Sequence, residues 1–156
     1  MEFGEFGDLP PPPQSPPGHG IRNDSLDGIF FWCYIMAAGW EVEFTNEFER
    51  WWDGLKQEEQ EDVAASVILL QRFGPTLPYP HCSGIAASRH SHMRELRIQH
   101  AGRPYRVLYA FNPLRAAILL IGGDKTGNDR WYEMFVPAAD DLYDGHIEEL
   151  KKAGKL

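Results

Sequence analysis

Basic side chains gather in one part of this sequence, between Arg89 and Arg130. That segment holds eight Lys and Arg residues and three acidic ones, a local charge of +5 in a chain whose net charge is −8. Residues 40–72 carry the opposite excess, with nine acidic and three basic residues. A basic segment within an acidic chain is a candidate for one anion-binding face. The chemistry to look for there is the holding of phosphates and the movement of protons.

Arg106 lies in the apolar strand-like sequence PYRVLY. An arginine in such surroundings is costly unless it is paired or faces an anion. Two interpretations stay open, because Arg106 could form an ion pair with Glu95 or bind an anion. Alternation along the preceding strand predicts that Glu95 and Arg97 share one face and that Arg94 lies on the other.

Lys125 follows an apolar run and the sequence GGD, so it stands where a strand ends in a glycine-rich loop. Functional groups are common in such places. A nucleotide-binding P-loop is excluded, because Asp rather than Gly directly precedes the lysine. Trp131 and Tyr132 follow next to Arg130. Cations and aromatic rings that converge in this way suit RNA, although packing in the core is the alternative for the two rings.

His81, Cys82, His90 and His92 raise the hypothesis of a zinc site. Their spacing matches no structural zinc pattern, so we expect no metal and no other cofactor. Cys33 and Cys82 form no CxxC motif, and a disulfide framework is not expected, which favours the cytoplasm. No segment approaches the roughly 20 apolar residues of a membrane span, so we expect no membrane association.

Hydrophobic periodicity predicts the elements that must position these residues. In chain order we expect a strand at Trp40–Phe44, helices at Asn46–Leu55 and Glu58–Phe73, strands at Met93–His100, Tyr105–Asn112 and Ala116–Gly122, and a C-terminal helix. Thr45 is the expected N-cap of the first helix, and Pro137 is expected to begin or kink the last one. The three later strands are joined by turn-like sequences, which makes them antiparallel. The fold class is therefore α+β, in the order β-α-α-β-β-β-α, with a small antiparallel sheet.

Residues 1–28 are rich in Pro and Gly and have little to bury. This segment could be a genuine tail with a Pro-rich ligand motif, or an upstream region with the natural start at Met36. We favour the second, because foldable sequence begins directly after Met36. A secretory signal is a poorer third interpretation, because Asp24 and Asp27 precede the apolar run. We expect residues 1–36 to be a disordered or wrongly assigned N-terminal extension, and residues 37–156 to be one domain.

The motifs MRELR, GRPYRVLYAF, AILLIGGDKTG and WYE, in this order and before a C-terminal helix, resemble the RelE/HigB superfamily of type II toxin–antitoxin toxins. The phage-derived toxin-like branch is the most similar part, and WEVEFTNEFERWW resembles the opening of that branch. The resemblance runs from about Trp40 to Leu150. It implies a curved antiparallel sheet with helices packed on one face. It also implies a metal-independent endoribonuclease, or mRNA interferase, in which a ribose 2′-hydroxyl attacks the adjacent phosphate, usually on the ribosome.

The resemblance also implies roles for particular residues. Arg106 matches a phosphate and transition-state clamp, Arg97 a basic residue beside it, and Lys125 the basic residue after the last strand. Tyr132 matches the aromatic acid or base, with Trp131 as the alternative. Arginine is a poor base because its pKa exceeds about 12, so proton transfer falls to Tyr132, Lys125 or a histidine such as His92. Further RNA contacts are expected from Arg94, Arg103, Arg130, Trp131 and His92.

The expected partners are mRNA, the ribosome and a cognate antitoxin, commonly of the helix-turn-helix type. Two other functions stay open on the same fold. One is a ParE-like inhibitor of DNA gyrase, and the other is a catalytically inactive antitoxin-binding module. The combination of Arg97, Arg106 and Lys125 favours RNA cleavage over gyrase binding.

Overall fold

The computed structural model describes residues 39–156, so the expectations for residues 1–36 lie outside the described residues. The chain forms an α+β domain, which confirms the predicted fold class. Its elements are β1 (Val42–Phe44), α2 (Asn46–Asp53), α3 (Gln57–Phe73), a 3₁₀ turn (Gly74–Thr76), β2 (Cys82–Gly84), β3 (Arg94–His100), β4 (Arg103–Phe111), β5 (Ala117–Asp124) and α4 (Trp131–Lys152). The predicted order is kept, with the short strand β2 as an addition.

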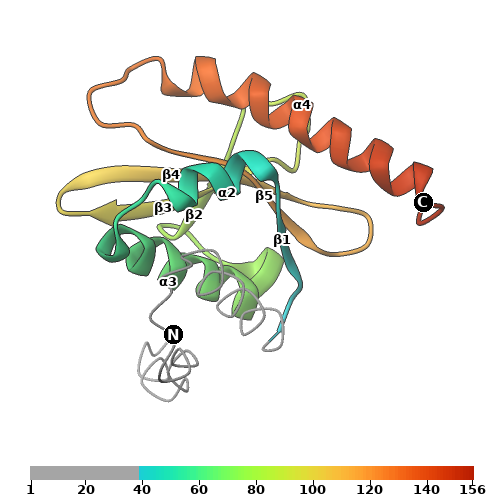
Figure 1. The fold of residues 1–156 in the computed structure, drawn as a ribbon, viewed down its shortest axis with the longest axis horizontal. Coiled ribbons are helices and arrows are strands. Elements are labelled where there is room, and N and C mark those ends of the chain that lie inside the picture. Colours follow the sequence, from blue (N-terminus) through green and yellow to red (C-terminus); the bar gives the residue numbers. More distant parts are fainter. Residues whose placement is uncertain (1–38) are drawn as a thin grey trace, which may run out of the picture.

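The five strands form one sheet in the order β1-β5-β4-β3-β2 (Figure 1). Strands β2 to β5 pair antiparallel, as predicted for the three long ones. Strand β1 pairs parallel to β5, with Val42 opposite Ala117 and Phe44 opposite Leu119. The sheet is therefore mixed rather than wholly antiparallel. Two helices and three strands separate β1 from β5 in the sequence, and a connection of this length permits parallel pairing.

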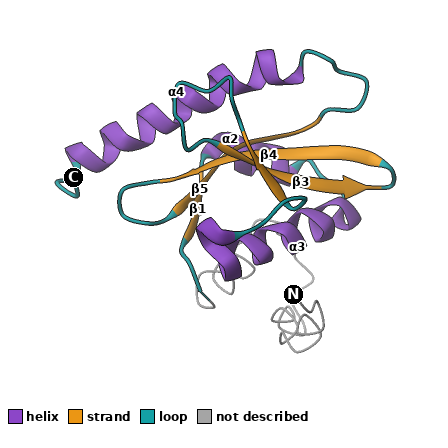
Figure 2. Cartoon of the chain, turned by 180° about the vertical axis from the view of Figure 1, so that it is seen from behind, coloured by secondary structure: helices purple, strands orange, loops and turns teal. Residues whose placement is uncertain are grey.

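Helices cover both faces of the sheet (Figures 1 and 2). Helices α2 and α3 pack on one face, where Phe48 and Val67 meet Val107 and Leu119 in one core cluster. Helix α4 packs on the opposite face in a second cluster of alternate strand residues, such as Leu108. The expectation of helices on one face thus holds for α2 and α3 but not for α4. Strands that are apolar on both faces, like β4 and β5, require cover on both.

Local signals in the sequence explain where the helices begin. The side chain of Thr45 accepts a hydrogen bond from the Phe48 amide at 3.1 Å, which confirms the predicted N-cap of α2. Glu59 in the first turn of α3 accepts one from the Lys56 amide at 3.0 Å. Helix α4 begins at Trp131, and Pro137 lies inside it rather than at its start. Lys151 and Lys152 in its last turn complement the helix dipole.

Candidate active site

The carboxylate of Glu95 on β3 lies at the centre of a polar cluster on the α4 face of the sheet. Its Oε1 accepts hydrogen bonds from Ser83 Oγ at 2.8 Å and Arg97 Nη1 at 3.3 Å. Its Oε2 accepts one from the Tyr132 hydroxyl at 2.7 Å and lies 3.7 Å from Arg106 Nε. Side chains from β2, β3, β4 and α4 therefore meet at one carboxylate. We refer to these five residues together with Lys125 as the Glu95 cluster.

The register of the sheet explains why these side chains converge. Arg97 lies directly opposite Arg106 across the β3–β4 pair, and Glu95 lies two residues away on the same face. The predicted alternation along this strand is therefore confirmed. Two like charges directly opposite each other destabilise a sheet unless a counter-charge lies between them. Glu95 provides that charge, and Arg106 forms an ion pair with it at 3.7 Å, which is one of the two interpretations that the sequence left open.

Lys125 and Tyr132 close the cluster from the loop after β5 and the first turn of α4. The Lys125 ammonium donates a hydrogen bond to the Tyr132 hydroxyl at 3.3 Å and lies 4.8 Å from the centre of its ring. The Lys125 amide is fixed by a 3.0 Å bond to the Pro104 carbonyl. The Tyr132 hydroxyl thus lies between an ammonium group and a carboxylate. Such a hydroxyl can give a proton to one neighbour and be restored by the other.

The cations of the cluster differ in their access to solvent. The side chain of Arg97 is 30% exposed, whereas that of Arg106 is 4% exposed. Arg106 Nη1 donates to the Tyr105 carbonyl at 2.9 Å, and its Nε has no hydrogen-bond partner among the described residues. Lys125 and Tyr132 are half-buried. A phosphate at the surface would therefore meet Arg97 and Lys125, while Arg106 lies behind the carboxylate.

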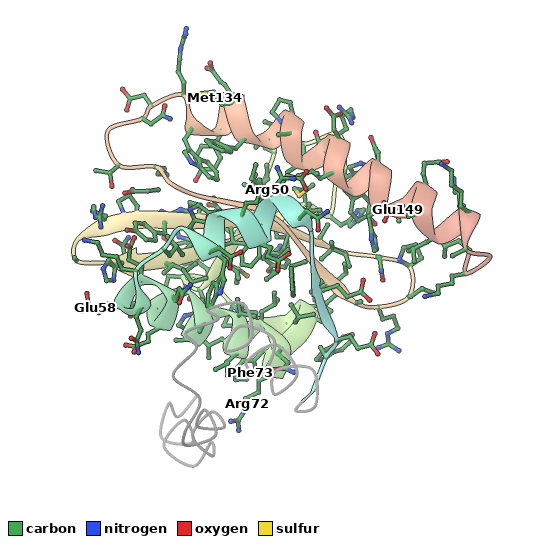
Figure 3. The ribbon with its side chains drawn as sticks, viewed as in Figure 1. Arg50, Glu58, Arg72, Phe73, Met134 and Glu149 are labelled. Carbon is green, nitrogen blue, oxygen red and sulfur yellow. The ribbon has the colours of Figure 1, made fainter. Side chains whose placement is uncertain are left out.

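The other predicted RNA contacts lie outside the Glu95 cluster. Arg94 lies on the opposite face of the sheet, where it donates to Cys82 Sγ at 3.3 Å. Arg103 pairs with Asp124 at 3.3 Å and covers the ring of Tyr105. Arg130 is exposed and pairs with Glu133 at the start of α4. This end of the helix is marked by the label of Met134 in Figure 3. Trp131 is 1% exposed and stacks on Phe135 in the core, so it offers no surface to a base.

His90 and His92 form hydrogen bonds with side chains of α4 and do not belong to the Glu95 cluster. His92 Nε2 lies 3.0 Å from the Tyr143 hydroxyl, and His90 Nε2 lies 2.8 Å from an Asp144 oxygen. Burial, and then the charge of His90, lowers the pKa of His92. Among residues 39–156, no group of three or more His, Cys, Asp or Glu side chains is arranged to hold a metal ion. In the same part of the chain, no helix is both long and apolar enough to cross a membrane.

From the sequence, Glu95 is only a possible partner of Arg106, and neither its central position nor the contribution of Ser83 is predicted. A glutamate between two arginines, in a strand that pairs with the apolar strand of Arg106, is a recognisable signal for a buried ion pair. Ser83 gave no such signal, because β2 spans three residues and shows no periodicity.

Comparison with known proteins places the chain in a family. Residues 50–144 match the family described as "Phage derived protein Gp49-like (DUF891)". "Putative toxin HigB2" of Mycobacterium tuberculosis (strain ATCC 25618 / H37Rv) is 35% identical over 117 residues, which cover 74% of this chain and 58% of that protein. "Putative toxin HigB3" of the same organism is 43% identical over 95 residues, covering 60% of this chain and 82% of that protein. The chain therefore belongs to the phage-derived Gp49-like family and is homologous to proteins named as HigB toxins, which confirms the family predicted from its motifs.

Proposed function

We propose that this chain is the toxin of a type II toxin–antitoxin system and that it cleaves mRNA, on the translating ribosome, as an endoribonuclease. Membership of the family and the names of the two relatives support the toxin assignment. The observation that carries the chemistry is the Tyr132 hydroxyl, which is bonded to both Lys125 and Glu95 and lies in the same cluster as Arg97.

The proposed reaction is attack of a ribose 2′-hydroxyl on the adjacent phosphate. It gives a 2′,3′-cyclic phosphate and a free 5′-hydroxyl. The charge that develops on the phosphorane needs cations, which Arg97 and Lys125 supply from the surface of the cluster. Tyr132 is the group in the cluster that can accept the 2′-hydroxyl proton, because the arginines remain charged at any accessible pH.

A cognate antitoxin, of the helix-turn-helix type, is the proposed partner that keeps the toxin inactive in the cytoplasm. We expect it to cover or distort the surface that presents Arg97 and Lys125, because these are the cluster's accessible cations. The toxin produced without antitoxin should then be poorly tolerated by the host.

Induction in a bacterial host tests the proposal directly. We expect the wild-type chain to arrest growth and to leave discrete cuts in a translated mRNA, mapped by primer extension. Arg97→Ala and Arg106→Ala should abolish both effects, and Arg50→Ala, an exposed arginine on α2, should abolish neither. Arrest without cuts would contradict RNA cleavage and favour gyrase as the target. The absence of arrest would contradict the toxin assignment.

A further inference from the structure

We infer that Glu95 is a positioning residue for this reaction, one that holds Tyr132 in place and takes up the proton that Tyr132 releases. The inference rests on the proposed function, because it names a further participant in the proposed cleavage. Glu95 itself lies behind Arg97 and Tyr132 and is 3% exposed, so it acts through these neighbours rather than on the RNA.

The surroundings of Glu95 are those of a charged carboxylate. A carboxylate in the interior is costly unless it is paired and its oxygens accept hydrogen bonds. Both oxygens of Glu95 have two polar neighbours within 3.7 Å, from four different elements. Glu95 also balances the charge of Arg106, whose side chain is almost wholly buried on the same face of the sheet. Glu95 is thus a buried carboxylate whose Oε2 faces the hydroxyl of the proposed acid–base residue.

This geometry gives a complete path for the protons. As the 2′-oxygen bonds to phosphorus, its proton moves to the Tyr132 oxygen, and the Tyr132 proton moves to Glu95 Oε2 along their 2.7 Å hydrogen bond. The bond from phosphorus to the 5′-oxygen breaks, its electron pair stays on that oxygen, and the oxygen takes a proton from Lys125. Glu95 then returns its proton to Lys125 through Tyr132, whose hydroxyl is bonded to both. Each group ends in its starting state.

The negative charge of Glu95 has a second consequence. It lies beside the cations that would hold a phosphate, so it weakens phosphate binding while it speeds proton transfer. Replacing Glu95 by Gln removes the charge and keeps the shape. The inference therefore predicts slower cleavage together with tighter phosphate binding. A residue that merely stabilised the fold would impair both when replaced.

The experiment compares Glu95→Gln with Glu61→Gln, an exposed glutamate on α3, in the full-length chain. Single-turnover cleavage of a ribosome-bound mRNA at saturating protein should slow about 10²-fold in Glu95→Gln, as for a misplaced proton-transfer group. Inorganic phosphate, titrated at low ionic strength and followed by NMR of the Arg97 and Lys125 side chains, should bind at least about threefold more tightly. That is the effect in bulk water of removing a like charge about 6 Å away. Glu61→Gln should match the wild type in both measurements.

A double-variant cycle keeps the test decisive if Glu95→Gln alters folding. Adding Glu95→Gln to Tyr132→Phe should cost no further cleavage rate, because the carboxylate acts through the tyrosine. An unchanged rate in the single variant, weaker phosphate binding, or additive losses in the double variant would each overturn the inference. A wild-type chain that cuts no RNA would instead overturn the proposed function. This outcome is distinguishable from failure of the inference about Glu95, because it is measured on the wild type and not on Glu95→Gln.

Discussion

Gly123 on β5 lies beneath the indole of Trp131, and a Cβ at this position would sit 2.7 Å from the indole Nε1. The preceding residue, Gly122, faces the other side of the sheet, where a Cβ would overlap Trp51 of α2. Successive residues of a strand point to opposite faces. The glycine pair thus allows one tryptophan from each helical layer to approach β5, so the two glycines of the GGDK sequence serve packing.

Replacing either glycine by alanine should destabilise the fold by about 1–3 kcal/mol, because each Cβ overpacks a close contact. The two variants should differ in activity. Gly123→Ala displaces Trp131 and with it Tyr132, so RNA cleavage should fall, whereas Gly122→Ala acts on α2, on the other face from the Glu95 cluster. Urea denaturation and cleavage assays at a temperature where both variants are folded test this difference. Equal cleavage by the two would contradict the coupling of Gly123 to Tyr132.

Lys125→Ala should lower the rate of RNA cleavage about 10²-fold, the typical loss when one group that stabilises transition-state charge is removed. The free energy of unfolding should change by about 1 kcal/mol, because the half-buried lysine loses one 3.3 Å hydrogen bond to Tyr132 and its contact with the ring of that residue. Arg50→Ala on α2 is the control for loss of a positive charge. A Lys125→Ala variant as active as that control would exclude Lys125 from the reaction.

The Tyr105–Glu59 pair should make stability depend on pH in both directions. Burial, and then the hydrogen bond to Glu59, raises the pKa of Tyr105 to about 12, while the same bond lowers the pKa of Glu59. Because the pKa of Tyr105 is higher in the folded protein than in the unfolded chain, Tyr105 contributes fully to the stability of the fold below about pH 10. This contribution is lost as the pH rises toward 12. Because the pKa of Glu59 is lower in the folded protein than in the unfolded chain, Glu59 stabilises the fold above the usual glutamate pKa of 4.5. This contribution is lost as the pH falls below that value.

Tyr105→Phe removes both contributions. We expect it to cost about 1–2 kcal/mol near neutral pH, with a deficit that shrinks below about pH 4 and above about pH 10. Urea denaturation across this range, with Tyr79→Phe as the control for an exposed tyrosine, measures the deficit. A deficit of constant size at every pH would show that the hydrogen bond to Glu59 does not govern it.

Much of the fold could be predicted because its signals are local. The apolar stripes of α2 and α3 and the cap at Thr45 lie within a few residues of each other, and the predicted bounds agree closely with the structure. The parallel pairing of β1 with β5 is a contact between distant segments, which no local pattern encodes. The start of α4 at Trp131 was hidden by Pro137, which the helix tolerates in its second turn.

The candidate site could be predicted in part for the same reason. Alternation along β3 predicted that Glu95 and Arg97 share a face, and the family resemblance placed Arg97 beside Arg106 on the neighbouring strand, where the structure has it. Trp131 and His92 were assigned to RNA on residue type, but tertiary packing decides where they go. Trp131 fills the space over Gly123, and His92 bonds to Tyr143 of α4. Neither contact can be read from the spacing of residues along the chain.

Asp140 and Asp141 are neighbours on α4 that differ in burial, and they provide a further prediction about the loop before β3. Asp140 is buried, and it accepts hydrogen bonds from the Ser88 hydroxyl and, at 3.0 Å, from the Arg89 amide. Asp141 is exposed and pairs with the Arg89 side chain at 2.9 Å.

Asp140→Ala should therefore destabilise the fold by about 1–3 kcal/mol, since it leaves two donors without their acceptor. Asp141→Ala should cost less than about 1 kcal/mol, because exposed ion pairs contribute little. Hydrogen exchange at the Arg89 amide should accelerate strongly in the first variant and barely in the second. Similar protection of that amide in both variants would mean that α4 does not hold the loop through Asp140.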